Sequence, residues 1–171
     1  MRRSYQESFA ALAESVEIVG EPRPVVSRPP RADDLEFGPS IFRTLVEGVD
    51  LSELTLPGLY VGRSELRGVF FAGSDLRLST FNWSDISACS FYRCDLSGAD
   101  LRGCSFEKCS FTQADLSQTD LRHSNFKDCD FTGARLQAAL LLPYQRPLLL
   151  LSAEQDAVVA WSDESAEPSG G

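Results

Sequence analysis

The most regular feature of this sequence is an apolar residue at every fifth position. A period of five fits neither the 3.6 residues of a helical turn nor the alternation of a β-strand. The run covers 21 consecutive positions without an insertion: Ile41, Val46, Leu51, Leu56, Val61, Leu66, Phe71, Leu76, Phe81, Ile86, Phe91, Leu96, Leu101, Phe106, Phe111, Leu116, Leu121, Phe126, Phe131, Leu136 and Leu141. In a chain that is 43% apolar, chance does not produce such a run, so the pattern predicts a repeat architecture.

The positions around each apolar centre also repeat. From residue 74 to residue 139, the residue two places before each centre is Ser, Thr, Ala or Cys, and the residue just before it is often Asp. The unit is therefore small–polar–(Leu/Phe)–x–x. All five cysteines lie in the small position, which indicates that cysteine is a small buried filler in this chain.

A second period, equal to four of these units, lies on top of the first. Phe71, Phe91, Phe111 and Phe131 follow it, and so do Cys89, Cys109 and Cys129. A chain that turns a corner in every unit closes a four-sided coil after four units. Stacked coils then place residues i and i+20 about 4.8 Å apart, the spacing of hydrogen-bonded strands. The sequence thus predicts an all-β solenoid whose coils bury a core only when stacked.

The composition divides the chain into four segments. We expect residues 1–40 to form a helix at about 5–18, started by a Ser4–Glu7 capping box, and an irregular proline-rich lead. Residues 41–141 form the solenoid, and its early units "GVDLSELTLPGLYVG" are degenerate and predict a loose first coil. Residues 142–161 form a C-terminal cap or dimerisation segment, and residues 162–171 a disordered tail.

The C-terminal segment is apolar and interrupted by prolines. An open solenoid end exposes apolar side chains and unpaired strand edges that must be covered. Two interpretations remain open: the segment folds back over the last coil, or it forms a homodimer. The residues in question are Leu148, Leu149, Leu150, Leu151, Val158, Val159 and Trp161.

Charge and hydropathy exclude several classes of partner. The net charge of −9 argues against direct binding of nucleic acid through its phosphates. No apolar run approaches the roughly 20 residues of a membrane span. Glutamates interrupt the N-terminal stretch "MRRSYQESFAALAESVEIV", so we expect no signal peptide, a cytoplasmic location and reduced thiols.

The sequence contains no constellation typical of a catalytic site, and we predict that the protein is not an enzyme. His123 is the only histidine and falls at an outward corner, where it is interpreted as a surface residue. The cysteine column would form a line, whereas zinc requires four converging ligands, so we expect neither a metal nor a cofactor.

The units "CDLSG", "ADLRG", "CSFEK", "CSFTQ" and "ADLSQ" resemble the pentapeptide repeat family, whose unit is A(D/N)LXX. The match is strong over residues 64–138 and looser over 41–63 and 139–141. The resemblance implies a right-handed quadrilateral parallel β-helix of about five coils. Members of the quinolone-resistance type bind the DNA site of type II topoisomerases, especially DNA gyrase, and inhibit or protect it. The pentapeptide inhibitors of topoisomerases are often dimers.

The recurring aspartates are the candidate partner-binding residues. Asp75, Asp95 and Asp115 lie on one side of the coil, and Asp100 and Asp120 on the next. By the resemblance, they would imitate DNA phosphates and bind gyrase, giving resistance to topoisomerase poisons. Residues 41–141 carry 13 acidic and 10 basic residues, which weakens this hypothesis. The alternative is a protein–protein interaction module, an adaptor or an immunity protein, that binds through its atypical N- and C-terminal segments.

Overall fold

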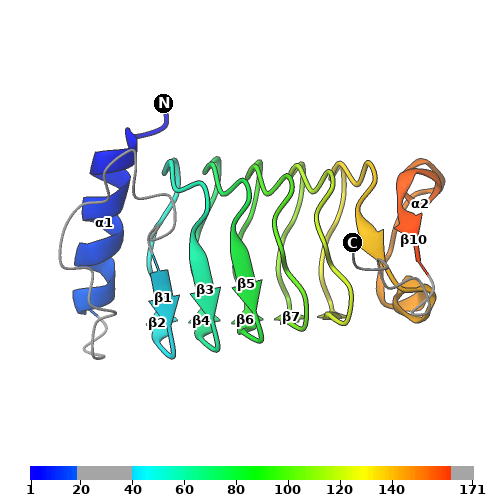
Figure 1. The fold of residues 1–171 in the computed structure, drawn as a ribbon, viewed down its shortest axis with the longest axis horizontal. Coiled ribbons are helices and arrows are strands. Elements are labelled where there is room, and N and C mark those ends of the chain that lie inside the picture. Colours follow the sequence, from blue (N-terminus) through cyan, green and yellow to red (C-terminus); the bar gives the residue numbers. More distant parts are fainter. Residues whose placement is uncertain (19–39, 163–171) are drawn as a thin grey trace, which may run out of the picture.

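The chain forms a parallel β-solenoid of about six turns with a helix across one end (Figure 1). The structure is a computed structural model, and it describes residues 1–18 and 40–162. The predicted proline-rich lead therefore lies, at residues 19–39, outside the described residues, as does the predicted tail from residue 163 onward. The predicted β-solenoid with a short N-terminal helix is confirmed.

The coils stack in a constant register, in which residue i pairs with residue i+20. Parallel pairing joins Val61 to Phe81, and Ile86 to Phe106 in the same register. The strands are short because each side of a coil is only one repeat unit long. They are β1 (Ser40–Phe42), β2 (Leu45–Glu47), β3 (Tyr60–Gly62), β4 (Glu65–Arg67), β5 (Thr80–Asn82), β6 (Asp85–Ser87), β7 (Ser105–Glu107), β8 (Asn125–Lys127), β9 (Leu140–Leu141) and β10 (Ala160–Trp161).

Four columns of paired residues define four sides, which we number in chain order. The first side contains the sheet β1–β3–β5 and continues through Asp100 and Asp120 to β9 and β10. The second side is the sheet β2–β4–β6–β7–β8. Single bridges from Asp50 to Asp130 make the third side, and bridges from Thr55 to Arg135 make the fourth.

The core is the stack of apolar centres predicted from the sequence. All 21 of them are buried. The phenylalanines of the third side stack with their rings nearly parallel, and the centroids of Phe91 and Phe111 are 5.0 Å apart. Rings of a neighbouring side meet this stack edge-on, as Phe106 meets Phe111 at 75°. Both arrangements are favoured by aromatic quadrupoles, so the Phe ladder adds to the stability that burial provides.

The residue two places after most apolar centres turns a corner in the left-handed conformation. In the described part of the chain, thirteen non-glycine residues have φ between 50° and 62°, including Arg43, Arg63 and Trp83. Each such residue costs roughly 1 kcal/mol relative to a right-handed conformation. The hydrogen bonds of the flanking coils outweigh that cost, and the corner side chains point away from the core.

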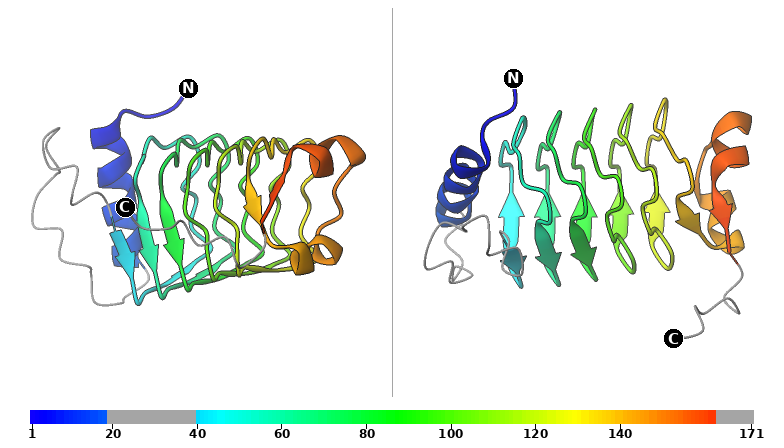
Figure 2. Two further views of the ribbon diagram at one scale, coloured as in Figure 1. Left: turned by 45° about the vertical axis from the view of Figure 1, so that its right-hand side comes forward. Right: turned by 45° about the horizontal axis from the view of Figure 1, so that its top comes forward.

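The helix α1 (Tyr5–Ile18) covers the first coil (Figure 2). Its predicted capping box is confirmed, because the Ser4 hydroxyl accepts from the amide of Glu7 and the Glu7 carboxylate accepts from the amide of Ser4. Phe9 and Leu12 are buried, and Leu12 belongs to the solenoid core. No helix in residues 1–18 or 40–162 is long and apolar enough to cross a membrane.

The first coil is as regular as the others, so the expectation that it is loose is wrong. Leu54 and Leu59 occupy positions where small residues usually lie, yet both are fully buried. The amide of Leu54 donates to the Ser74 hydroxyl of the next coil at 2.9 Å, and the bridge from Thr55 to Asp75 keeps the register. Both leucines belong to the same buried core as Leu12 of α1.

The C-terminal segment closes a sixth turn in the same register. β10 pairs in parallel with β9, with Ala160 opposite Leu140 and Trp161 opposite Leu141. Between these strands, the 3₁₀ helix η1 (Pro143–Leu148) and the helix α2 (Ala153–Val158) replace the flat sides of a regular coil. This last turn is the orange and red end of the rod in Figure 1.

Two glutamines cover the carbonyl groups that the last regular coil leaves open. The side-chain amide of Gln145 donates to the carbonyls of Leu121 and Ser124 at 2.9 and 2.7 Å. Gln155 donates in the same way to Phe131 and Ala134, at 2.7 and 3.0 Å. In regular coils the backbone amide of residue i donates to the carbonyl of residue i−21, as Asn125 does to Cys104. Each glutamine side chain thus makes the bond that its own backbone amide would otherwise make.

We predict that Gln145→Ala destabilises the rod by about 2–3 kcal/mol, because it removes the donor to the Ser124 carbonyl and one of the two donors to the Leu121 carbonyl. Gln145 is fully buried, and its side-chain oxygen also accepts from the amide of Leu142. Chemical denaturation followed by circular dichroism measures the loss. Gln137→Ala, which removes an exposed glutamine of the preceding coil, is the control and should change stability by less than about 0.5 kcal/mol. Equal effects of the two substitutions would show that Gln145 does not cap the coil.

Candidate interaction surfaces

The predicted aspartate ladder of the fourth side is present and in register. Asp75, Asp95 and Asp115 occupy successive coils, with bridges from each to the next. The carboxylate of each accepts a hydrogen bond from the backbone amide two residues on, at 3.2, 3.1 and 3.0 Å. Aspartate in this slot therefore stabilises the turn that follows it, which is a structural role.

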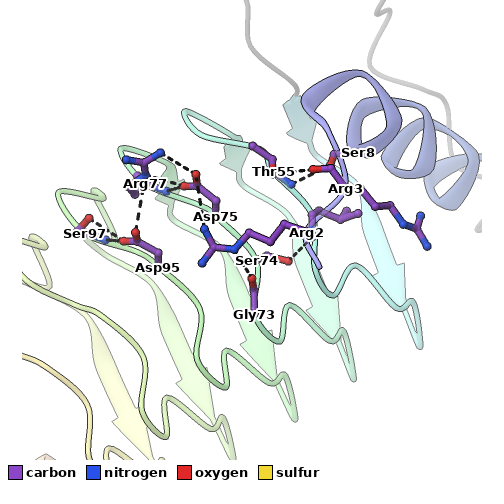
Figure 3. A network of polar contacts seen from close by, with 11 residues as sticks. Arg2, Arg3, Ser8, Thr55, Gly73, Ser74, Asp75, Arg77, Asp95 and Ser97 are labelled. Carbon is purple, nitrogen blue, oxygen red and sulfur yellow. Dashed lines mark hydrogen bonds and ion pairs between the residues drawn. The ribbon is translucent and has the colours of Figure 1, made fainter.

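Arginines pair with the same carboxylates (Figure 3). Arg77 forms two parallel hydrogen bonds with Asp75, at 2.9 and 2.8 Å, and its Nε lies 3.7 Å from Asp95. Arg2, from the segment before α1, lies 3.9 Å from Asp75 and donates to the carbonyl of Gly73. Asp75 is nearly buried, and burial would raise its pKa, but the hydrogen bonds and charge of Arg77 outweigh burial, so the pKa is lowered.

The first-side ladder is paired in the same manner. Arg102 makes two hydrogen bonds to Asp100, at 2.9 and 2.7 Å, and Arg122 makes two to Asp120, at 3.0 and 2.7 Å. Arg102 also lies 3.7 Å from Asp120 and so links the two coils. Burial opposes the negative charge of Asp100, but Arg102 lowers its pKa below the ordinary value.

All five predicted aspartates thus have an arginine within 4 Å, including Asp115, whose Oδ2 is 3.7 Å from Arg135. The structure brings together two ladders, as predicted, but they are ladders of ion pairs. A DNA mimic requires continuous negative potential, and alternating charges cancel much of that potential beyond about 10 Å. The binding role of these residues stays a prediction.

The C-terminal residues singled out from the sequence divide into two groups. Leu149 and Val159 are buried in the core of the rod, and Leu151 and Trp161 pack partly against it. Leu148, Leu150 and Val158 are exposed, and Leu150 is 89% exposed. The first group lies where a cap requires apolar residues. The second remains available for a second copy of the chain, and the homodimer stays a prediction.

The cysteines lie in the small column, and four of the five are buried. Burial raises the pKa of Cys104 to about 12, so its thiol is protonated at neutral pH and is a poor nucleophile or ligand. In the described part of the chain, no group of three or more His, Cys, Asp or Glu side chains is arranged to hold a metal ion.

The sequence reasoning missed a cluster of exposed aromatic and cationic side chains on the first three coils. Phe42 and Tyr60 lie on the first side, with ring centroids 6.3 Å apart. Trp83, at the corner between the first and second sides, is 71% exposed. Arg43 and Arg63 occupy the same corner in the first and second coils that Trp83 occupies in the third, and we call these stacked positions the corner column. The available signal was the occurrence of large aromatic residues in positions that the repeat directs outward.

A comparison with known families agrees with the fold. Residues 89–128 match the family model of pentapeptide repeats, in eight copies. The chain therefore carries pentapeptide repeats over these residues, as its resemblance to that family predicted. Its match to the family covers the coils that contain Asp95, Asp100, Asp115 and Asp120, and no catalytic family is indicated. No curated protein sequence matches the chain.

Solved pentapeptide repeat structures resemble this protein to different degrees. A pentapeptide repeat protein from the thylakoid lumen of Arabidopsis thaliana superposes with a TM-score of 0.59 at 25% identity, over 72% of this chain and 81% of that one. Rfr23 from the cyanobacterium Cyanothece 51142 gives a TM-score of 0.46 at 12% identity, over 57% and 83%. The plasmid-mediated fluoroquinolone resistance protein QnrB1 gives 0.27 at 20% identity, over 60% and 52%. The last two likenesses are too distant to indicate what this protein binds.

The lowered pKa values of Asp75 and Asp100 predict a loss of stability in acid. A depressed carboxyl pKa contributes stability above the unfolded value of about 4, and this contribution is lost as the pH falls through the folded value. Asp100→Asn keeps the turn but removes the ion pair, so the free energy of unfolding should fall by about 1 kcal/mol at pH 7 and depend less on pH between about 5 and 2.

Urea denaturation at a series of pH values tests this prediction. Asp85→Asn is the matched control, because Asp85 has no ion pair in the described part of the chain. If the free energy of unfolding of Asp100→Asn depends on pH below pH 5 in the same way as that of the wild type, the lowered pKa of Asp100 is not a source of stability.

Proposed function

We propose that this protein is a non-catalytic binding protein whose partner is another protein, held on the first side of the rod over the first three coils. The observation that carries the proposal is the cluster of exposed Phe42, Tyr60 and Trp83 beside Arg43 and Arg63. Aromatic residues and arginine are enriched in protein interfaces and supply most of their binding energy.

The contacts at the two ends of the rod are consistent with binding on a side. α1 covers the first coil, and the amide of Thr55 at the open edge donates to the Ser8 hydroxyl at 2.8 Å (Figure 3). At the other end, the side-chain amides of Gln145 and Gln155 donate to the open carbonyl groups of the last regular coil. These contacts engage described residues of both end segments with the rod and leave the sides of the coils accessible to a partner. The proposal therefore keeps the interaction-module hypothesis but moves its binding surface from the ends to a side.

A quantitative capture experiment tests the proposal. The immobilised full chain is incubated with extract of its source cells, and bound proteins are compared with those bound by two double variants. Tyr60→Ala/Trp83→Ala should reduce capture of the partner at least tenfold. Phe70→Ala/Tyr92→Ala removes two exposed aromatic residues from the third side and should leave capture unchanged. If no captured protein distinguishes the two double variants, the proposed surface is wrong.

Binding to a type II topoisomerase, DNA gyrase, as a DNA mimic is the second candidate function. It is favoured by the in-register carboxylates of Asp75, Asp95 and Asp115, and it would protect or inhibit the enzyme and give resistance to its poisons. The arginine pairing described above counts against it. For that reason we place it after the aromatic surface.

A DNA gyrase supercoiling assay at two salt concentrations, with and without a gyrase poison, tests this second candidate. The mimic hypothesis predicts inhibition or rescue that weakens steeply as salt rises, because carboxylates would replace phosphates. Asp95→Lys/Asp115→Lys should abolish the effect, and Lys108→Glu should not. An absence of any effect at micromolar protein would reject gyrase as the partner.

A further inference from the structure

An open groove follows the corner between the first and second sides at the N-terminal end of the rod. It is lined by the column of Arg43, Arg63 and Trp83. Glu65 and Asp85, two residues after Arg63 and Trp83 in the chain, line it as well. Parallel coils stack at about 4.8 Å, so the two arginines are one such step apart and Trp83 is a further step along.

The two guanidinium groups are not neutralised by the described part of the protein. Glu65, the acidic residue nearest to Arg63 in sequence, is engaged by Arg67. Arg43 lies over the ring of Phe42, at 5.2 Å from the guanidinium carbon to the ring centroid, and neither Arg43 nor Arg63 has an ion-pair partner among residues 1–18 and 40–162. Every ladder arginine of the first and fourth sides, by contrast, is paired. This pair is therefore available to bind an external carboxylate.

The orientation of the Trp83 ring depends on the residue that follows it in the corner column. The next residue of the column is Gly103, and a Cβ atom there would lie 3.1–3.3 Å from atoms of the Trp83 ring. Residues with side chains occupy the same corner conformation elsewhere, such as His123 with φ 62°, so the backbone alone does not demand glycine. The absent side chain lets the indole lie flat over the neighbouring corner, with its outer face exposed.

We propose that this groove binds an extended segment of a protein partner that carries an acidic residue followed four positions later by an apolar one. The inference rests on the proposed function and specifies its recognition chemistry. The indole of Trp83 lies over the corner of Gly103, one coil further along the column. A carboxylate midway between Arg43 and Arg63 therefore lies about 12 Å from the ring, since coils repeat at about 4.8 Å. Side chains four positions apart on one face of an extended chain are about 13 Å apart, so an acid–x–x–x–apolar motif matches both sites.

The charges of the groove favour a protein over a nucleic acid. Phosphates bound by Arg43 and Arg63 would lie beside Glu65 and Asp85, and the whole chain has a net charge of −9. An acidic side chain on a mostly neutral peptide meets the arginines without placing a row of negative charges beside Glu65 and Asp85. Neighbouring backbone amides of such a segment are also suitable donors for Glu65 and Asp85.

Titration of the ¹⁵N-labelled full chain with a short peptide, acetyl-Ser-Gly-Glu-Ser-Gly-Ser-Leu-Gly-Ser-amide, tests the inference. The chain has two tryptophans, so the indole N–H signal of Trp83 reports on the groove, and that of Trp161 in the C-terminal cap is an internal reference. We expect the Trp83 signal to shift saturably and the Trp161 signal to remain in place. Replacing Glu by Gln in the peptide, or moving Leu to the third position after Glu, should weaken binding roughly tenfold.

Matched variants of the protein complete the test. Arg43→Gln/Arg63→Gln should weaken peptide binding at least roughly tenfold, since both charge-assisted hydrogen bonds are lost. Arg93→Gln is the control: Arg93 has the same left-handed corner conformation but lies on another side, where it donates to Gln113. Gly103→Ala should displace the indole and weaken binding without a change of charge.

The outcomes separate this inference from the proposed function. No shift of Trp83 at millimolar peptide, or equal binding by the Arg43/Arg63 and Arg93 variants, would overturn the inference. Tighter binding of a single-stranded oligothymidylate than of the peptide would overturn it as well, in favour of a nucleic-acid groove. If the peptide fails while capture still depends on Tyr60 and Trp83, the proposed function stands without this motif. If the peptide binds as expected but capture is unaffected by those residues, the proposed function fails and the groove remains a peptide site.

Discussion

The backbone hydrogen bonds between coils, which keep residue i beside residue i+20 throughout, are the interaction on which the rest of this structure depends. They set the stacking distance, and the stacking distance aligns identical side chains of successive coils. Phe91 and Phe111, 5.0 Å apart with nearly parallel rings, show the consequence in the core. Asp100 and Asp120 show it on the surface. One insertion or deletion within a coil would shift every later column and replace inward residues by outward ones.

A register that propagates indefinitely creates two open ends, and the two ends are closed by different means. At the first coil, α1 buries Phe9 and Leu12, and the Ser8 hydroxyl accepts from the exposed edge amide of Thr55. At the last coil, the glutamine amides of Gln145 and Gln155 donate to carbonyls that a further coil would have used. Both solutions satisfy hydrogen-bonding groups that would otherwise remain open at a sheet edge, where other chains are prone to add.

The outward-facing residues of the rod differ between its first three coils and its later coils. In the later coils, arginine–aspartate pairs such as Arg122–Asp120 neutralise one another and leave little unbalanced charge. In the first three coils, aromatic side chains and the guanidinium groups of Arg43 and Arg63 take outward positions. Trp83 contributes little to folding, because the residue remains 71% exposed. A rigid scaffold with an exposed aromatic and cationic surface is suited to recognition, since little conformational entropy is lost when it binds.

The sequence by itself determined the solenoid, its four sides and its core, because the period of one unit and the period of four units specify the inward side of every unit from Ile41 to Leu141. The helix at Tyr5–Ile18 followed from its capping box and apolar spacing. The tertiary structure decided what those periods do not encode. It showed that Arg2 and Arg77 pair with Asp75, because an outward residue's partner depends on side-chain reach across coils and sides. It showed that Gln145 acts as a cap, because a cap belongs to no repeat. It also assembled Arg43, Arg63 and Trp83 into one groove, since the column that unites them exists only once the coils are stacked.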